Sequence, residues 1–220
     1  MNKEWADLNK AMQFHLKKKD GFASGIATLF ELRKELLKQI AAFRTQLTVE
    51  DFCAMPYRNA KGYHSKTIAY SLWHIFRIED IVAHTLIAGD EQVFFAGDYQ
   101  RKINSPIITT GNELTGDEIV SFSQKLCIDE LYAYLEAVDS ASNEILGNLA
   151  YEDIKRKLTD DKRTALEKLG VVSNDENACW LIDYWCGKDI KGLIQMPFSR
   201  HWIMHVEACI RIMDKLLSDR

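Results

Sequence analysis

The sequence predicts an all-α fold, namely an antiparallel four-helix bundle with short extra helices. Apolar residues recur every three or four positions in four long segments, at about 22–47, 65–88, 115–149 and 198–217. Strand-like alternation is scarce along the 220 residues. The segments are joined by connections of modest length, and long amphipathic helices connected in this way are typical of a bundle.

The composition favours one domain spanning residues 1–220. Only 3 prolines and 11 glycines are present, and no linker rich in proline, glycine or serine divides the chain. The hydrophobic fraction of 47% is ordinary for a globular protein. The net charge of −4 gives no electrostatic footprint for nucleic acid, so no nucleic-acid partner is expected.

The cysteines and the apolar runs indicate the cellular compartment in which the protein is expected. The five cysteines include no close pair, and the nearest two are Cys179 and Cys186, so free thiols in a reducing cytoplasm are expected. The segment 1–5 lacks the apolar core of a signal peptide. No uncharged apolar run approaches the ~20 residues that span a bilayer. We therefore expect a cytoplasmic protein with no membrane partner.

The first two elements are amphipathic. Residues 2–18 predict a short helix, and residues 22–47 predict a longer one. Its expected buried stripe consists of Leu29, Leu32, Leu36, Ile40 and Phe43. Its expected solvated side chains are Arg33, Lys34, Lys38 and Arg44. Thr48 is a suitable cap for a short helical turn at 49–52, and Pro56 stops its continuation.

The segment 65–88 is densely apolar, and a helical wheel divides it into two faces. A narrow arc predicted to be its solvent edge contains Lys66, Trp73, Arg77, Asp80 and His84. His74 lies more than about 60 degrees from that arc, so its side chain is predicted to point inward and that of His84 outward. Glu79 falls in the apolar arc, where it could orient a ligand or buffer a buried charge, but the favoured interpretation is a rim carboxylate that reaches toward solvent.

A long connection and a third helix follow. Residues 90–114 predict an irregular connection, and a loop of this length is usually functional or packs over a site. Residues 93–95 are its expected anchor to the core, and a short strand pair is left open. Thr115 and Glu118 form a capping-box signature that opens the 115–149 helix. Its carboxylates, Asp139 among them, are expected on a solvated face.

Two shorter helices precede the last one. Residues 151–169 predict a polar helix closed by Gly170, and residues 174–186 predict an aromatic-rich helix. The final helix, about 198–217, follows Pro197.

The final helix carries two histidines on one face. His201 and His205 are four residues apart, and Ala208 and Ile212 lie within about 40 degrees of them on the wheel, so this face is predicted to be buried. With His74 they make a candidate site of three imidazoles on facing helices. Three protein ligands leave a coordination position open, as in a catalytic zinc site, and imidazole suits Zn, Ni, Fe or Cu. The alternative is a set of hydrogen-bonded core histidines.

Two stretches resemble a known family. The segment 67–79, which contains His74, resembles the second helix of the DinB/YfiT-like metal-binding superfamily, and the segment 200–205 resembles its last helix. Residues 48–56 resemble its loop between the first two helices. The resemblance implies a four-helix bundle in which His74, His201 and His205 bind a divalent metal, with zinc or nickel favoured. It does not cover the N-terminal segment, the 90–114 connection or an insert at 150–196.

The resemblance also implies a function. Characterised members of the superfamily include transferases and isomerases that use low-molecular-weight thiols, and a metal stabilises the reactive thiolate. We therefore expect a metal-dependent thiol S-transferase or related hydrolase whose partners are a low-molecular-weight thiol and an electrophilic small molecule. The pattern indicates no catalytic residue. Candidates for the surrounding pocket are Tyr70, Trp73, Glu79 and Trp202.

The alternative function is a non-catalytic helical bundle in which a structural metal or a histidine cluster holds the helices together. Such a protein would act in interactions or in a stress response. Trp180, Tyr184 and Trp185 would then suit a partner or homodimer surface, although core packing is the commoner fate of such residues. Cys179, Cys186 and Cys209 have no basic neighbours in the sequence and are interpreted as buried, inert thiols.

Overall fold

The structure is a computed structural model that describes residues 2–220. Within these residues the chain is all-helical, and no β-strand is formed; one isolated bridge joins Lys157 and Asp189. The strand pair left open for 90–114 is therefore absent from the described residues. None of the helices in residues 2–220 is long and apolar enough to cross a membrane.

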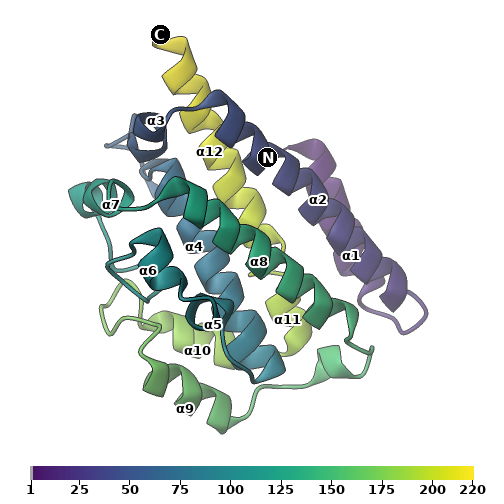
Figure 1. Cartoon of the computed structure of the whole chain (residues 1–220). Coiled ribbons are helices and arrows are strands. Elements are labelled where there is room, and N and C mark those ends of the chain that lie inside the picture. The colour runs from purple at the N-terminus through teal and green to yellow at the C-terminus, as the bar shows by residue number, and fades with distance from the viewer. Residues whose placement is uncertain (1) are drawn as a thin grey trace.

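The longest connections are 104–115 and 170–179, and Figure 1 shows the elements in chain order. Those of the first half are α1 Lys3–His15, α2 Phe22–Gln46, α3 Val49–Cys53, η1 Gly62–His64, α4 Ile68–Asp80, η2 Ile81–Ala88, α5 Val93–Ala96 and α6 Tyr99–Ile103. Those of the second half are α7 Gly116–Ser123, α8 Ile128–Gly147, η3 Asp153–Lys155, α9 Asp160–Leu169, α10 Trp180–Cys186, α11 Ile190–Ile194 and α12 Arg200–Ser218.

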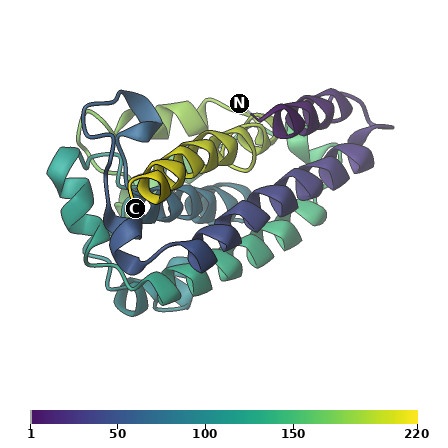
Figure 2. The same ribbon diagram turned by 90° about the horizontal axis from the view of Figure 1, so that it is seen from above.

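The long helices α2, α4, α8 and α12 lie side by side (Figures 1 and 2). Helix α4 packs against both α8 and α12, and α2 packs against α12 and α8. Helix α1 packs along the outer side of α2. The predicted helices at 22–47 and 198–217 are confirmed as α2 and α12. The prediction for 65–88 is confirmed as α4 continued by the π-helix η2.

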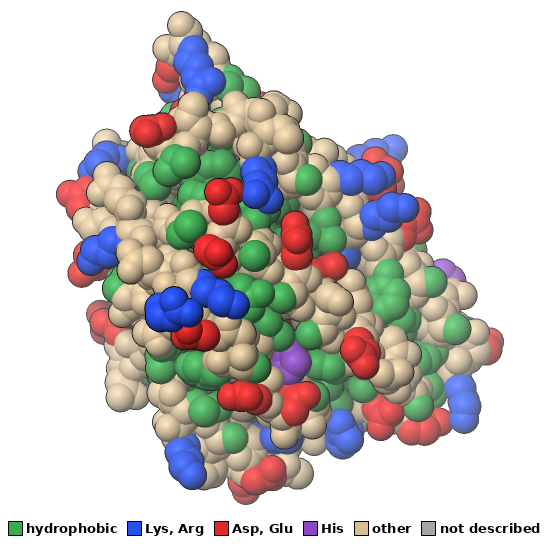
Figure 3. Space-filling view, viewed as in Figure 1, with side chains coloured by type: hydrophobic (Ala, Val, Ile, Leu, Met, Phe, Trp, Pro, Cys, Tyr) green, Lys and Arg blue, Asp and Glu red, His purple; other side chains and the backbone are tan. Residues whose placement is uncertain are grey.

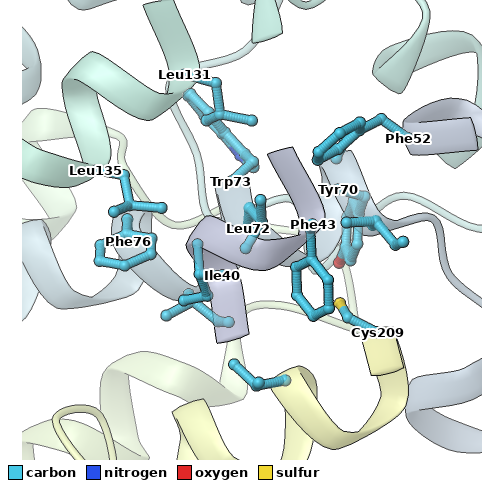
Figure 4. Close-up of a cluster of buried hydrophobic side chains, with 14 of the residues drawn as sticks. Ile40, Phe43, Phe52, Tyr70, Leu72, Trp73, Phe76, Leu131, Leu135 and Cys209 are labelled. Carbon is cyan, nitrogen blue, oxygen red and sulfur yellow. The ribbon is translucent and has the colours of Figure 1, made fainter. Parts of the chain in front are cut away.

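The core between these helices is apolar (Figure 4). Ile40 and Phe43 of α2 meet Leu72 and Phe76 of α4 there, and Leu135 comes from α8. The predicted stripe of α2 is buried throughout, with no member more than 1% exposed. Burial of such side chains stabilises each by about 1.5–3 kcal/mol relative to exposure, so this stripe fixes how α2 faces its neighbours.

The predicted 115–149 helix is wrong as one element, because the structure divides it into α7 and α8. The capping box of Thr115 and Glu118 is present at the start of α7, as predicted. The helix is interrupted at Cys127, whose backbone is extended and whose N–H donates to the carbonyl of Ile103 over 2.9 Å. The buried Leu126 and Ile128 are two positions apart rather than three or four, and this change of apolar phase accompanies the break in the helix.

The predicted solvent edge of α4 is also wrong. Trp73, Arg77 and Asp80 are fully buried, and His84 is only 7% exposed. Helix α4 is central, because α3, α5, α7, α8 and α12 all pack against it, and a helix covered on every side has no solvent edge.

The polar side chains of this arc form hydrogen bonds with other segments of the protein instead of with water. The carboxylate of Asp80 accepts hydrogen bonds from the N–H groups of Val93 and Phe94 at 2.8 and 2.9 Å. It also accepts one from the Tyr134 hydroxyl at 2.8 Å. His84 Nδ1 lies 2.6 Å from the carboxylate of Asp90. The side chains predicted to face solvent therefore hold the connection after η2 in place, with Phe94 buried as its predicted anchor.

A buried ion-pair network corrects three further predictions. Arg33 is not solvated but 1% exposed, and it donates to both carboxylate oxygens of Glu79 at 2.9 and 2.7 Å. It also donates to Asp139 at 2.6 Å, so this carboxylate does not belong to a purely solvated face. Glu79 is no rim carboxylate, because it is fully buried and also accepts from Trp202 Nε1 at 2.8 Å. Burial alone would lower the pKa of Arg33, but the carboxylates of Glu79 and Asp139 raise it above its usual value.

The insert at 150–196 is helical and lies at the η2 end of the long helices (Figure 1). The helix predicted at 151–169 begins only at Asp160, and Gly170 closes it with a φ of +63°, as predicted. The helix predicted at 174–186 begins at Trp180, and α11 was not predicted at all. Buried apolar side chains of the insert form a second cluster with η2, which includes Leu86, Leu166 and Trp185.

On the face seen in Figure 3, acidic and basic side chains are intermingled and separated by apolar and uncharged ones. This distribution agrees with the small net charge of −4.

Candidate metal centre

Three histidines from two helices converge in the interior, as predicted. His74 lies in the second turn of α4, and His201 and His205 lie in successive turns of α12. The centroids of their rings are 4.9 Å apart for His74–His201, 4.8 Å for His74–His205 and 4.6 Å for His201–His205. The inward direction inferred from the helical wheels is therefore confirmed for all three.

Local sequence sets these positions. The Thr67 side chain caps α4 by accepting from the N–H of Tyr70, which fixes the rotation of the helix one turn before His74. Helix α12 begins at Arg200, after Pro197 and the cap residue Ser199. His201 therefore lies in its first turn, and His205 projects from the same face one turn later.

All three imidazoles are deeply buried and neutral. Their exposed fractions are 5%, 6% and 2% for His74, His201 and His205. Burial lowers the pKa of His74 to about 4, even though its hydrogen bond to the Thr110 carbonyl favours the charged form. Burial, followed by the charge of the neighbouring histidines, places the pKa values of His201 and His205 well below their usual range. Neutral imidazoles carry the free lone pair that a metal requires.

The carbonyl of Thr110 fixes the tautomer of His74. His74 Nδ1 lies 2.7 Å from this oxygen, and because a carbonyl only accepts, Nδ1 carries the proton. Nε2 of His74 therefore presents its lone pair. A ligand histidine whose other nitrogen donates to a carbonyl is the usual outer-shell arrangement at protein metal sites.

Residues 108–111 are held over the triad by a row of side chains on α4. The Tyr70 hydroxyl donates to the Gly111 carbonyl at 2.9 Å, and Arg77 Nε donates to the Ile108 carbonyl at 2.9 Å. His74 contacts the carbonyl between them, that of Thr110. Gly111 has a φ of +77°, and a Cβ there would come within 3.1 Å of the Tyr70 ring. Part of the 90–114 connection therefore contacts the triad through Thr110, although the connection is not irregular throughout, because it contains α5 and α6.

Unpartnered nitrogens make the triad a candidate cation site. His201 Nδ1 and both ring nitrogens of His205 are buried without a hydrogen-bond partner. Each unsatisfied buried polar atom costs about 1–3 kcal/mol. A divalent cation that bound one nitrogen of each ring would give a partner to up to two of these nitrogens, one on His201 and one on His205.

The distances fit a single ion after an adjustment. One ligand nitrogen of each histidine lies within 4.8 Å of the others. Zinc–imidazole bonds are about 2.0–2.1 Å long, so two nitrogens on one tetrahedral ion lie about 3.4 Å apart. The most distant pair of nitrogens therefore has to approach by up to roughly 1.4 Å to share one ion. The residues present fit a divalent metal.

A pocket opens onto the triad. It has a volume of about 310 Å³, and His74 and His201 form part of its wall. The remaining wall is largely aromatic and apolar, with Tyr63, Trp180, Tyr184 and Trp185 among the lining residues. His205 does not line the pocket and lies behind the other two histidines, beneath the Tyr63 ring at a centroid distance of 4.7 Å.

The residues predicted to surround the site are mostly elsewhere. Trp73, Glu79 and Trp202 are fully buried in the core and are not among the pocket-lining residues. Tyr70 does contact the triad, because its ring stacks on His74 at a centroid distance of 5.5 Å and an interplanar angle of 10°. The wheel of α4 could place Tyr70 next to His74, but it carried no information about the partners that cover the other side chains.

The aromatic residues of the insert lie beside the histidines, and Trp185 is packed into the second core cluster at 1% exposure. Trp180, Tyr184 and Trp185 line the pocket in front of the histidines, although Trp180 is also 48% exposed. Asn112 joins the same wall from the connection after η2. Sequence analysis missed Asn112 and Thr110, and their only signal was the glycine between them in a long connection.

The cysteines lie outside the histidine cluster. Cys209 is buried as predicted, and burial raises its pKa to about 12, so it is an inert thiol at neutral pH. Cys179 is exposed and Cys186 is half-buried, so the prediction of burial is wrong for these two. None of the three is grouped with His74, His201 and His205 as a metal ligand.

The buried histidines predict a pH-dependent stability of the metal-free protein. In the unfolded chain a histidine takes up a proton near pH 6.5, whereas folded His74 does so only near pH 4. Above pH 6.5 both states are neutral, and between these values the unfolded state binds more protons. We therefore expect the urea midpoint of the apoprotein to fall as the pH is lowered from 7 to 5. A midpoint that is constant across this range would contradict buried neutral imidazoles.

Known proteins supply no further assignment. Neither the protein-family models nor the curated protein sequences contain a match to this chain. The functional argument therefore depends on the triad of His74, His201 and His205 and on the pocket in front of it.

Proposed function

We propose that this chain is a divalent-metal-binding protein of the DinB/YfiT-like type that acts as a metal-dependent thiol S-transferase or related hydrolase. His74, His201 and His205 are the proposed ligands, and zinc or nickel is the favoured ion. The proposed arrangement of α2, α4, α8 and α12 is the antiparallel four-helix bundle of that superfamily. The proposed partners are a low-molecular-weight thiol and an electrophilic small molecule in the cytoplasm.

One observation supports catalysis over a purely structural site. Two of the three proposed ligands, His74 and His201, line the 310 Å³ pocket, so a small molecule in the pocket reaches the place where the three rings converge. Structural zinc sites are closed by four protein ligands, whereas catalytic ones keep a position for water or substrate. Three histidines beside a pocket match the second pattern.

Each part of the site has a separate task in the proposed reaction. A bound divalent ion would stabilise the thiolate form of the thiol, which is the nucleophile. Thr110 holds the Nδ1 proton of His74 and thereby keeps Nε2 directed at the ion. The aromatic wall excludes water from the thiol and positions the electrophile. In the transfer, a sulfur–carbon bond forms as the bond from that carbon to its leaving group breaks.

Metal removal tests the proposal. The protein is purified without a metal-binding tag, and its metal content is measured by elemental analysis before and after chelation. We expect about one divalent ion per chain. We also expect the stripped protein to remain folded and to lose its ability to consume a thiol together with 1-chloro-2,4-dinitrobenzene. Re-addition of zinc or nickel should restore that activity.

The same experiment distinguishes the non-catalytic alternative. A protein that loses most of its thermal stability on chelation, and shows no turnover of any thiol–electrophile pair when loaded, holds a structural ion. A protein that purifies without metal and does not take it up would contradict both the catalytic and the structural metal, and would leave the triad as a cluster of core histidines.

A further inference from the structure

We infer that the pocket beside the triad selects a small apolar ligand, aromatic in its body, that carries a single anionic donor at the end facing the histidines. This inference rests on the proposed function, and it names the class of thiol that the site would accept. The inference depends on the side chains that line the pocket in front of the histidines, and not on the histidines themselves.

The wall of the pocket is aromatic on several sides. Trp180, Tyr184 and Trp185 come from α10, and Tyr63 comes from η1, which is distant from α10 in the sequence. Trp180 and Tyr184 are arranged edge to face, with ring centroids 5.7 Å apart and an interplanar angle of 72°. Aromatic side chains arranged in this way offer both faces and edges to a flat ligand.

The polar content of the wall is low and contains no acid. Ile78, Leu181, Met196 and Pro197 complete most of the apolar surface, and Asn112 adds one side-chain amide. No aspartate or glutamate is among the described residues that line the pocket. A polar, multiply charged thiol would lose its hydration in such a pocket without gaining partners, which disfavours it.

Cations around the pocket decide the charge of the ligand. Lys188 lies over the Tyr184 ring at 4.2 Å, and Lys66 lies over the Tyr70 ring at 5.0 Å beside the triad. Arg200 is close enough to Tyr63 to affect its hydroxyl electrostatically. An aromatic cage can attract a quaternary ammonium ion, but here the wall contains no acid, and Lys66, Lys188 and the proposed divalent ion add positive charge near it, although Glu113 also lies near Tyr70. These charges favour an anionic donor and oppose a cationic ligand.

The volume limits the size of the ligand. About 310 Å³ is at the small end of ligand pockets, which range over about 300–1,000 Å³. A single ring with a short substituent fills such a space. Phenylmethanethiol is therefore a suitable probe, because it joins one aromatic ring to one ionisable donor.

Binding to protein loaded with cobalt(II) tests the inference without any measurement of turnover. Thiolate binding is followed by the sulfur-to-cobalt charge-transfer absorption and by calorimetry, after elemental analysis has shown that the ion is bound. We expect phenylmethanethiol to bind at least about tenfold more tightly than 2-mercaptoethanol, because only the former fills the aromatic wall. Benzyltrimethylammonium, which has the ring but the opposite charge, is expected not to bind.

A variant identifies the wall that is responsible. Trp180→Ala removes a half-exposed indole of the wall, and it is expected to weaken phenylmethanethiol roughly three- to tenfold while leaving 2-mercaptoethanol unchanged. Phe14→Ala is the matched control, because Phe14 is 63% exposed on α1 and lies outside the pocket. It should change neither affinity.

The outcomes separate this inference from the proposed function. If the two thiols bind equally, if Trp180→Ala has no effect, or if benzyltrimethylammonium binds more tightly than phenylmethanethiol, the assignment of the ligand class is wrong while thiol binding stands. If neither thiol alters the cobalt spectrum of the loaded protein, the thiol-dependent function fails, and the assignment of its substrate fails with it.

Discussion

Replacement of His201 or His205 by alanine is expected to lower the affinity for zinc or nickel by more than about 100-fold. Loss of a mere outer-shell partner of a ligand costs 10–100-fold, and removal of a ligand from a three-histidine site removes one of the metal's direct bonds. The measurement is a competition titration with a chromophoric chelator, supported by elemental analysis. Circular dichroism and thermal unfolding establish that each variant is folded.

The matched control is His15→Ala. His15 lies in the last turn of α1, outside the buried cluster of His74, His201 and His205. Its removal should leave the metal affinity unchanged. If a folded His201→Ala or His205→Ala variant binds metal as tightly as the parent protein, the ligand assignment is wrong.

Among the variants proposed here, Glu79→Ala is expected to lower the free energy of unfolding most, by about 3–5 kcal/mol. Arg33 would remain buried with only the carboxylate of Asp139, and Trp202 Nε1 would lose its acceptor. Removal of one partner of a buried ion pair leaves an uncompensated charge in the core. For a chain of this size the loss corresponds to a decrease in Tm of roughly 6–20 °C, measurable by calorimetry at fixed pH.

A second ion pair on α2 provides the comparison. Glu35 pairs with Lys38 at 2.5 Å, and the side chain of Lys38 is 57% exposed. Glu35→Ala should change the free energy of unfolding by no more than about 1 kcal/mol, because exposed pairs are screened by solvent. If Glu35→Ala and Glu79→Ala lowered the free energy of unfolding equally, the Arg33 network would not be shielded from solvent in the way that the structure shows.

The outer features of the fold were predictable because they depend on local signals. The stripe Leu29–Phe43 specified how α2 faces the core, and the capping boxes of Thr48 and Thr115 marked where helices begin. The spacing of His201 and His205 placed both rings on one face of α12. In each case residues within about one or two helical turns carried the information.

The prediction failed where a helix is covered on every side. A wheel assigns polar residues to solvent, and this rule misplaced Arg77 and Asp80 on α4 and His84 on η2, whose partners are on other segments. It misplaced Arg33 on α2 for the same reason, because the compensating carboxylates of Glu79 and Asp139 are 46 and 106 residues away. Pairing over such distances leaves no periodic signal in either helix.

The sequence by itself determined that the protein is all-helical and that three inward histidines lie on two of its long helices. Only the tertiary structure decided that their rings meet, that the Thr110 carbonyl orients His74, and that α10 lines the pocket in front of them. The physical reason is the range of the interactions. Helix formation and helical faces follow from residues three or four positions apart, whereas a site follows from the packing of segments distant in the chain.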